Sequence, residues 1–166
     1  MASRDNSLTE RRNSAASVDQ IKLNEAHPPK QNAIEAFNVI LPTIKKEILK
    51  SRAHWDKHEP RMWARASKLS DDELTAFTIE NDLVEVRSAP TSYGYIVFGK
   101  IRIPAVNDEE GEGFVHVRIH DPPNRGNADV IFHSLFTDEI RDDPDLPPVN
   151  YRAIQTVDKP LEFFNE

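Results

Sequence analysis

Residues 113–136 read GFVHVRIHDPPNRGNADVIFHSLF, and this stretch sets the expected fold. Two apolar runs, rich in β-branched and aromatic residues, are separated by a loop of Pro, Asn and Gly. Such runs between turn residues are typical of β-strands. They contain three of the chain's six histidines, His116, His120 and His133. The stretch therefore predicts two strands of a sheet, and it raises the question of whether the histidines form a site.

The segments around this stretch predict an α+β fold. The runs LVEVR and YGYIVFGKIRIP precede it, and YRAIQTV follows it as a candidate edge strand. Helical patterns come first in the chain and strands later, which is typical of helices packed on one face of an antiparallel sheet. We expect N-terminal helices at about 32–80 on one face of a four- to five-stranded antiparallel meander at about 83–158. Residues 31–166 then form a single domain.

Helix boundaries are indicated by capping residues and by one proline. Asn32 as N-cap with Glu35 three residues later predicts a capping box, and 70–73, SDDE, predicts a second one that opens a short helix through about Asn81. Pro42 removes a backbone hydrogen bond and predicts a kink or a restart. The first helix carries an apolar stripe at helical spacing, formed by Ile34, Phe37, Leu41, Ile44 and Ile48.

The basic segment at 43–68 contains Trp55 and Trp63 and allows two interpretations. A basic amphipathic helix with aromatic residues can target anionic membranes or calmodulin-like proteins. Acidic residues and Pro60 interrupt the pattern, however. We therefore expect the tryptophans to close one end of the core, and we predict no membrane partner.

Composition limits the classes of function. The chain has 166 residues and no cysteine, so disulfides and thiolate metal sites are excluded. No apolar run reaches the roughly 20 residues that span a bilayer, and the N-terminus lacks a secretory apolar stretch. We expect a location in the cytoplasm or nucleus.

Charge is distributed unevenly along the chain. The net charge is −7, which disfavours nucleic acid as a partner. Residues 1–68 contain 13 Lys/Arg and 8 Asp/Glu, whereas 69–166 contain 8 and 20. The basic half can pack on the acidic half, or it can offer a basic surface to an acidic partner.

The first 30 residues are predicted to be a disordered tail, because their apolar residues have no period and two prolines close the segment. Arg11-Arg12-Asn13-Ser14 resembles substrates of basophilic kinases, and the sequence before Ser7 is a looser version. Phosphate on either serine would add nearly two negative charges. Such short matches also arise by chance.

Side-chain alternation predicts two different faces for the hairpin at 93–120. Pairing Tyr95, Val97, Ile101 and Ile103 with Val115, Val117 and Ile119 makes an apolar face for the helices. The opposite face then carries cations, aromatic rings and histidines, and we interpret it as a binding surface for an acidic protein or an anionic small ligand. Besides Ile96, its residues are Phe98, Lys100, Arg102, Phe114, His116, Arg118 and His120.

The register of the next strand decides whether the histidines meet. Placing Val130, Phe132 and Phe136 under the helices buries two phenylalanines, each contributing roughly 1.5–3 kcal/mol when fully buried. That register would put His133 opposite His116, and Asp129 opposite His120.

The histidines allow two further interpretations. Four residues of strand separate His116 and His120 by roughly 13 Å, which is too far for one zinc ion, so no metal or other cofactor is predicted. The alternative function is a small hydrolase or isomerase, with His116, His120 and His133 as acid–base groups and Asp129 as orienting carboxylate. The gap NDEEGEG lacks the ligand order of a calcium loop and predicts a solvated turn.

Non-enzymatic binding is the leading expectation, with the tail as a phosphorylation-controlled appendage.

Overall fold

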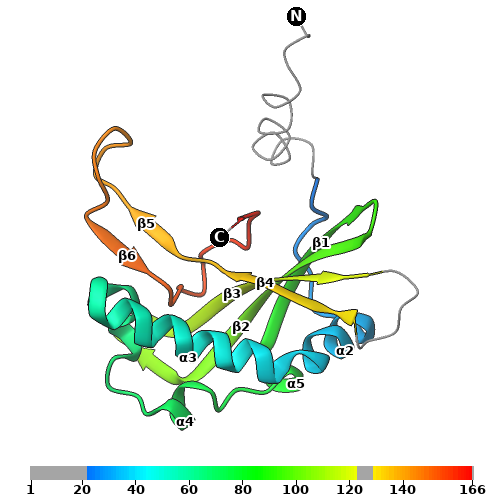
Figure 1. Ribbon diagram of the computed structural model, residues 1–166, viewed down its shortest axis with the longest axis horizontal. Helices are drawn as coiled ribbons and strands as arrows, with labels where there is room; N and C mark the ends of the chain where they lie inside the picture. Colours follow the sequence, from blue (N-terminus) through cyan, green and yellow to red (C-terminus); the bar gives the residue numbers. More distant parts are fainter. Residues whose placement is uncertain (1–21, 123–128, 166) are drawn as a thin grey trace, which may run out of the picture.

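A four-stranded antiparallel sheet forms the centre of the computed structural model, which describes residues 22–122 and 129–165 (Figure 1). The strand order is β1-β2-β3-β4, so each strand pairs with its neighbour in the chain. This confirms the predicted α+β meander. The strands are β1 (Leu83–Thr91), β2 (Gly94–Asp108), β3 (Gly111–Asp121) and β4 (Ile131–Leu135).

Helices cover one face of this sheet, and they lie below it in Figure 1. They are α2 (Gln31–Val39), α3 (Leu41–His58), the 3-10 helix η1 (Pro60–Ala66), α4 (Asp71–Leu74) and α5 (Ile79–Asp82). Pro42 lies in the first turn of α3, where its missing N–H needs no partner. The predicted restart at this proline is therefore confirmed.

One predicted capping box is present and the other is absent. Ser70 and Glu73 form the reciprocal bonds that start α4, as predicted. At the first helix the N-cap is Lys30, without a side-chain cap, so the prediction for Asn32 is wrong. The Glu35 carboxylate instead accepts a hydrogen bond from Gln31 at 3.2 Å. The predicted helix through Asn81 divides into α4 and α5, because Thr78 caps a new turn.

The apolar stripe packs on the sheet face that was predicted to receive it. Phe37, Ile44 and Ile48 are fully buried, and Ile34 and Leu41 pack at the margin of the same core. The register of β2 against β3 pairs Val97 with Ile119 and Ile101 with Val115, as alternation required. Tyr95 differs, since it is 51% exposed near the start of β2. The core between the helices and the sheet contains Val97, Ile101, Ile103, Val115, Val117 and Ile119.

The chain after β4 forms a second, two-stranded sheet from β5 (Asp138–Ile140) and β6 (Asn150–Arg152). The expected edge strand from YRAIQTV is present only in part, because Tyr151 and Arg152 pair with β5 while Gln155 forms an isolated antiparallel bridge with Phe114 of β3. The two tryptophans that were expected to close one end of the core differ in burial. Trp63 is fully buried, whereas Trp55 is half-buried and stacks on Tyr151 at a centroid distance of 6.1 Å.

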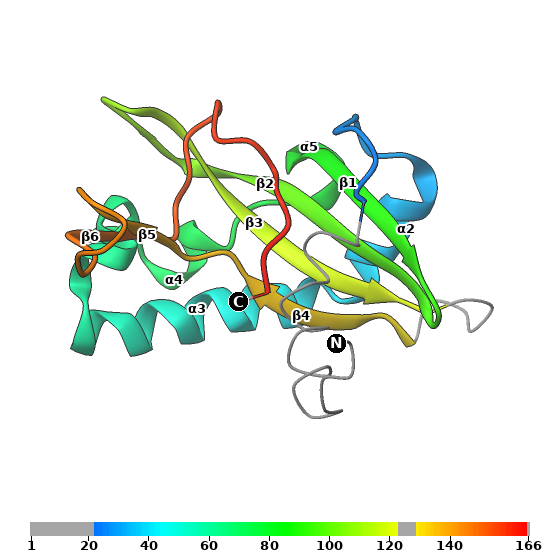
Figure 2. The ribbon, with the colours of Figure 1, turned by 90° about the horizontal axis from the view of Figure 1, so that it is seen from above.

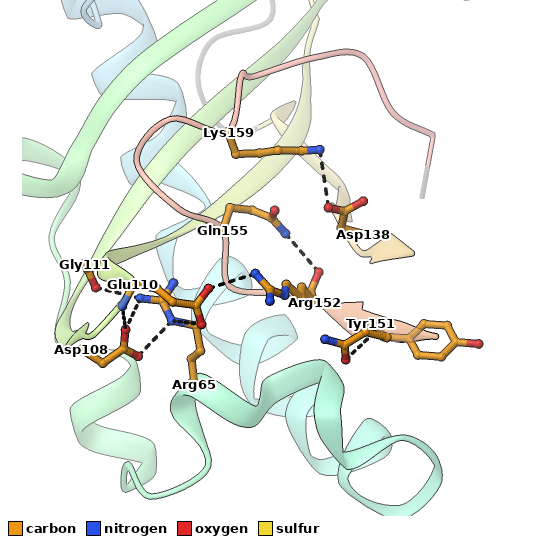
Figure 3. Close-up of polar contacts among 10 residues, drawn as sticks. Arg65, Asp108, Glu110, Gly111, Asp138, Tyr151, Arg152, Gln155 and Lys159 are labelled. Carbon is orange, nitrogen blue, oxygen red and sulfur yellow. Dashed lines mark hydrogen bonds and ion pairs between the residues drawn. The ribbon is translucent and has the colours of Figure 1, made fainter. Parts of the chain in front are cut away.

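The acidic β2–β3 turn is fastened to the rest of the protein by two arginines. Arg65 in η1 donates two hydrogen bonds to the carboxylate of Asp108, at 2.9 and 2.7 Å, and Arg152 donates to Glu110 at 3.0 Å (Figure 3). The ion pair of Arg152 with Glu110 also connects β6 to this turn. The turn is therefore held by arginines, although its acidic residues remain partly exposed.

Both ends of the described chain pack against the main sheet. His27 forms an antiparallel bridge with Val86, and the Asn24 N–H donates to the Ser88 carbonyl at 3.0 Å. Ordered structure thus begins before residue 31, the start expected for the folded domain. Residues 156–165, the C-terminal segment, cross the sheet on the face opposite the helices (Figure 2).

Packing between α2 and the sheet depends on a glycine. A Cβ at Gly99 would lie 2.5 Å from Cζ of Phe37, closer than two carbon atoms can approach. We expect Gly99→Ala to lower the free energy of unfolding by about 1–3 kcal/mol, because overpacking forces the ring or the strand to move. Urea denaturation measures this loss.

A double variant provides the control for this prediction. Phe37→Leu shortens the side chain that the added methyl group would meet, so combining it with Gly99→Ala should cost less stability than the sum of the two single losses. Strictly additive losses would contradict the proposed contact.

Candidate functional site

The strand register collects the predicted cations, aromatic rings and two of the histidines on one face of the sheet, opposite the helices. Phe98 pairs with Arg118, and Lys100 pairs with His116. We call this surface the cationic-aromatic face. It comprises Phe98, Lys100, Arg102, Phe114, His116, Arg118 and His120.

Most of this face is covered by the C-terminal segment. Phe98 is fully buried, and Lys100, Phe114 and His116 are at most 5% exposed. A second apolar cluster, separate from the helix-side core, joins the sheet to the segment. It contains Ile96, Phe98, Leu161 and Phe164, with Leu23, Phe136 and Phe163 packed against it. The face is therefore occupied by a segment of the same chain.

Lys100 holds the beginning of the C-terminal segment. Its ammonium group donates to the main-chain carbonyls of Val157 at 2.5 Å and Lys159 at 3.0 Å. It also lies 5.1 Å from the centroid of the Phe114 ring. Burial lowers the pKa of Lys100 below its ordinary value, while the carboxylates of Glu85 and Asp158 act in the opposite direction. A buried ammonium group needs such acceptors, because removing it from water is otherwise costly.

Two arginines hold the rest of the segment. Arg118 donates to the carbonyl of Phe164 at 2.9 Å and to the side chain of Asn165 at 2.7 Å. Its guanidinium lies 5.2 Å from the ring centroid of Phe163. Arg87 on β1 donates to the carbonyl of Leu161 at 2.8 Å. Burial lowers the pKa of Arg118. Cations thus bind the main chain while apolar side chains pack between them.

His116 is a buried neutral group beneath this cover. It is 1% exposed, and its Nε2 has no hydrogen-bond partner among the residues the structure describes. Its ring stacks on Phe136 with centroids 5.7 Å apart. Burial, reinforced by the charges of Lys100 and Lys159, lowers the pKa of His116 to about 3. The imidazole is therefore uncharged at neutral pH.

The other two predicted residues lie at the margin of the face. Arg102 pairs with the buried Asp82 of α5 at 2.9 Å and with Glu112 at 3.2 Å. These contacts raise its pKa, chiefly through the hydrogen bond to Asp82. His120 is half-buried and pairs with Ile96 across the strands. Arg102 thus binds carboxylates of the chain itself and does not reach the C-terminal segment.

The predicted register of β4 is wrong at Phe136. A bulge at His133 offsets the pairing, because Ser134 pairs with Arg118 and Phe132 with Ile119. An inserted residue reverses side-chain alternation. Phe132 therefore stays near the helix-side core as predicted, whereas Phe136 faces the opposite side and packs on His116.

The bulge also separates the residues of the enzymatic alternative. His133 lines a cleft of about 770 Å³ between α3 and the β4–β6 region, whereas His116 is buried on the opposite face. His120 pairs with Ile131, so the predicted pairing with Asp129 is absent, and Asp129 is exposed. His116, His120 and His133 therefore do not line a common cavity.

The cleft itself contains aromatic rings and a different histidine. Besides His133 it is lined by His54, Trp55, Tyr151 and Asp138. Asp138 forms an ion pair with Lys159 at 3.5 Å (Figure 3). Among the described residues no group of three or more His, Asp or Glu side chains could hold a metal ion. Nor could any helix of the described ranges cross a membrane.

Sequence reasoning missed the role of residues 156–165. The stretch TVDKPLEFFN has no strand alternation, although Leu161, Phe163 and Phe164 are a concentrated apolar group. This apolar group, close to acidic residues, was the feature of the sequence that could have indicated a docked segment. Its docking surface follows only from contacts with Phe98 and Arg118.

No family model, curated protein or solved structure matches this chain. Any functional interpretation therefore has to be argued from the geometry of the cationic-aromatic face.

The contacts of Lys100 lead to a prediction about the C-terminal segment. Lys100→Met keeps an unbranched buried side chain but leaves the carbonyls of Val157 and Lys159 without their donor. We expect a loss of about 1–3 kcal/mol in stability, as for other buried groups that lose a partner. Hydrogen exchange should also accelerate at 157–159.

The matched control is Lys46→Met, on the exposed face of α3. It should change stability by less than about 0.5 kcal/mol. Equal effects of the two substitutions would mean that the Lys100 contacts add no measurable stability.

Proposed function

We propose that the protein is a non-enzymatic binding and regulatory protein whose cationic-aromatic face receives an extended acidic segment of a protein partner. The observation that supports this proposal is the mode in which the face holds the chain's own C-terminal segment. Lys100 and Arg118 bind main-chain carbonyls, and Phe98 packs against Phe163 and Phe164. The face thus has donors and apolar contacts suited to an extended peptide.

The charge of the bound segment favours an acidic partner. Residues 156–165 contain Asp158 and Glu162 against one basic residue, Lys159, and Glu166 follows in the sequence. Glu162 is exposed. The carboxylates of the segment are thus attracted by the positive potential of the face, whereas its main-chain carbonyls and aromatic rings make the short contacts. Electrostatic complementarity of this kind adds specificity and speeds association.

An anionic small ligand is the weaker form of this proposal. The described cations of the face already bind carbonyls or carboxylates, and Arg102 is paired with Asp82 and Glu112. A small anion would satisfy the cations but would leave Ile96 and Phe98 uncovered. A peptide with aromatic side chains can replace both the hydrogen bonds to the cations and the apolar contacts with Ile96 and Phe98.

A peptide-binding experiment tests the proposal. A segment attached to the same chain has an effective concentration in the millimolar range, so it competes strongly with a free peptide. We therefore use full-length Phe164→Ala, which removes a ring contacting Phe98 and Phe136. A fluorescent peptide with the sequence of residues 156–166 should bind this variant at least about tenfold more tightly than the wild-type chain, as measured by anisotropy.

Two charge reversals distinguish the face from general attraction. Adding Arg118→Glu to Phe164→Ala should abolish binding, because it removes the donor to the Phe164 carbonyl and introduces repulsion. Adding Arg141→Glu should not, since Arg141 contacts Leu146 and Glu139 outside the face. A scrambled peptide controls for composition. Equal binding of both peptides, or no binding to any variant, would refute the proposed function.

The predicted tail regulation lies outside the described residues and is part of the proposal. We propose that a basophilic kinase phosphorylates Ser14 or Ser7 in the cytoplasm or nucleus. The added charge would act beside Arg11 and Arg12 and would change how the tail associates with charged surfaces.

A labelling experiment tests the kinase site. Protein kinase A, as a basophilic probe, should transfer labelled phosphate to the intact chain, and Ser14→Ala should reduce incorporation by more than half. Ser7→Ala measures the contribution of the looser match. Unchanged labelling of Ser14→Ala would remove Ser14 from the proposal.

A further inference from the structure

His116 occupies an unusual position for a titratable group. Its Nε2 is buried without a partner among the described residues, on the sheet face that the C-terminal segment crosses. The neighbouring Phe136 ring also packs against Phe164 of the C-terminal segment, with centroids 5.2 Å apart. The C-terminal segment is therefore linked to this imidazole in two ways, through the contact of Phe164 with Phe136 and through the charge of Lys159.

The charged groups that act on His116, directly or through its neighbours, come from β1, β2, β5 and the C-terminal segment. Lys100 faces it from β2, and Lys159 from the C-terminal segment, and both charges act on it. Asp138 of β5 pairs with Lys159, while Glu85 and Asp158 act on Lys100. Among the described residues, the charges that shift the pKa of the imidazole are both positive. An imidazolium in the closed state would thus meet two ammonium groups and would gain no hydrogen bond at Nε2.

The closed and open states must therefore bind protons differently. In the closed state the pKa of His116 is lowered to about 3. Opening removes Lys159 and the Phe164 ring that packs on Phe136, so the pKa of His116 rises toward the ordinary value of 6.5. Because the open state binds the proton more readily, acidification from pH 6.5 toward 3 favours opening.

We propose that the C-terminal segment is an intramolecular competitor of the partner's acidic segment, and that protonation of His116 releases it from the cationic-aromatic face. The proposal rests on the proposed function for the identity of the competing ligand. The release itself is a property of the isolated chain. The partner fitting the vacated surface is an extended segment with neighbouring aromatic residues, like Phe163 and Phe164, and nearby carboxylates.

The size of the effect follows from proton linkage. With a pKa of about 3 when closed and the ordinary value of 6.5 when fully exposed, lowering the pH from 7.5 to 5 increases the open-to-closed ratio by at most about 30-fold. Ordinary carboxylates have pKa values near 4, so most remain charged at pH 5. This window therefore separates His116 from the ion pair of Lys159 with Asp138.

Paired spin labels measure the release directly. The chain has no cysteine, so Lys46→Cys on α3 and Glu162→Cys on the segment provide two exposed labelling positions on opposite sides of the sheet. Double electron–electron resonance on the full chain should give one narrow distance distribution at pH 7.5. At pH 5 a broad component should grow, its ratio to the narrow one increasing by up to about 30-fold. No change in the distribution would overturn the proton-driven release.

His116→Gln is the matched variant, because glutamine is polar but does not titrate. The same spin-labelled pair in this variant should keep the same open-to-closed ratio between pH 7.5 and 5. Opening with the same pH dependence as in the wild-type background would assign the release to another group and refute the role of His116.

A second measurement does not depend on that substitution folding normally. In the NMR titration of the imidazole, Phe164→Ala should raise the apparent pKa of His116, because the variant is already partly open. Equal apparent pKa values with and without Phe164→Ala would show that the segment does not control the proton.

Different results would refute competition by the partner's segment and proton-driven release of the C-terminal segment. At pH 7.5 the unlabelled peptide of residues 156–166 should increase the broad component in the spin-labelled chain, and the scrambled peptide should not. Failure of the peptide with pH-dependent opening intact would reject competition and, together with the anisotropy result, the proposed function. A response to peptide without a response to pH would reject only the His116 mechanism.

Discussion

The main-chain carbonyls of residues 157–164 satisfy buried cations that project from the middle of a β-sheet, and the state of the candidate site depends on this interaction. Lys100 and Arg118 stand on strands whose opposite side is filled by the helix-side core. On the same face, the apolar side chains of Phe98 and Ile96 are buried by contact with the segment. A chain segment that supplies carbonyls and apolar side chains together satisfies both demands. A purely apolar cover would leave the charges unpaired, which is costly in a desolvated site.

The sheet consequently has two packed faces of different size. The helix-side core contains more than twenty buried residues, and the second cluster has four, with three partly buried neighbours. Removing the segment would expose only the smaller cluster and leave the larger intact. Proteins open locally where few apolar contacts hold a segment, at a lower free energy than global unfolding. The proposed exchange between the chain's own segment and a partner would therefore take place on this weaker side.

Interpretation from the sequence succeeded where one simple rule acted alone. Alternation in β2 and β3 placed Val97 and Ile119 on one face and Lys100 and His116 on the other. It failed at β4, where the extra residue at His133 reversed the face of Phe136. A bulge leaves no reliable mark in the residue pattern, because it depends on how the neighbouring strand is paired. The prediction of Asn32 as N-cap was also wrong, because the helix begins earlier, with Lys30 as its N-cap.

Even without the structure, the sequence determined the order of helices and strands, the apolar stripe of the first helices and the chemical difference between the two sides of the central hairpin. These features arise from residues that are near each other in the chain, with the periods of 3.6 and 2 that backbone geometry imposes. Only the tertiary structure decided that Leu161 and Phe164 cover Phe98, that Arg118 meets the carbonyl of Phe164, and that His116 lies apart from His133. Those contacts join residues some 46 or more positions apart or depend on an inserted residue, and local periodicity contains no information about either.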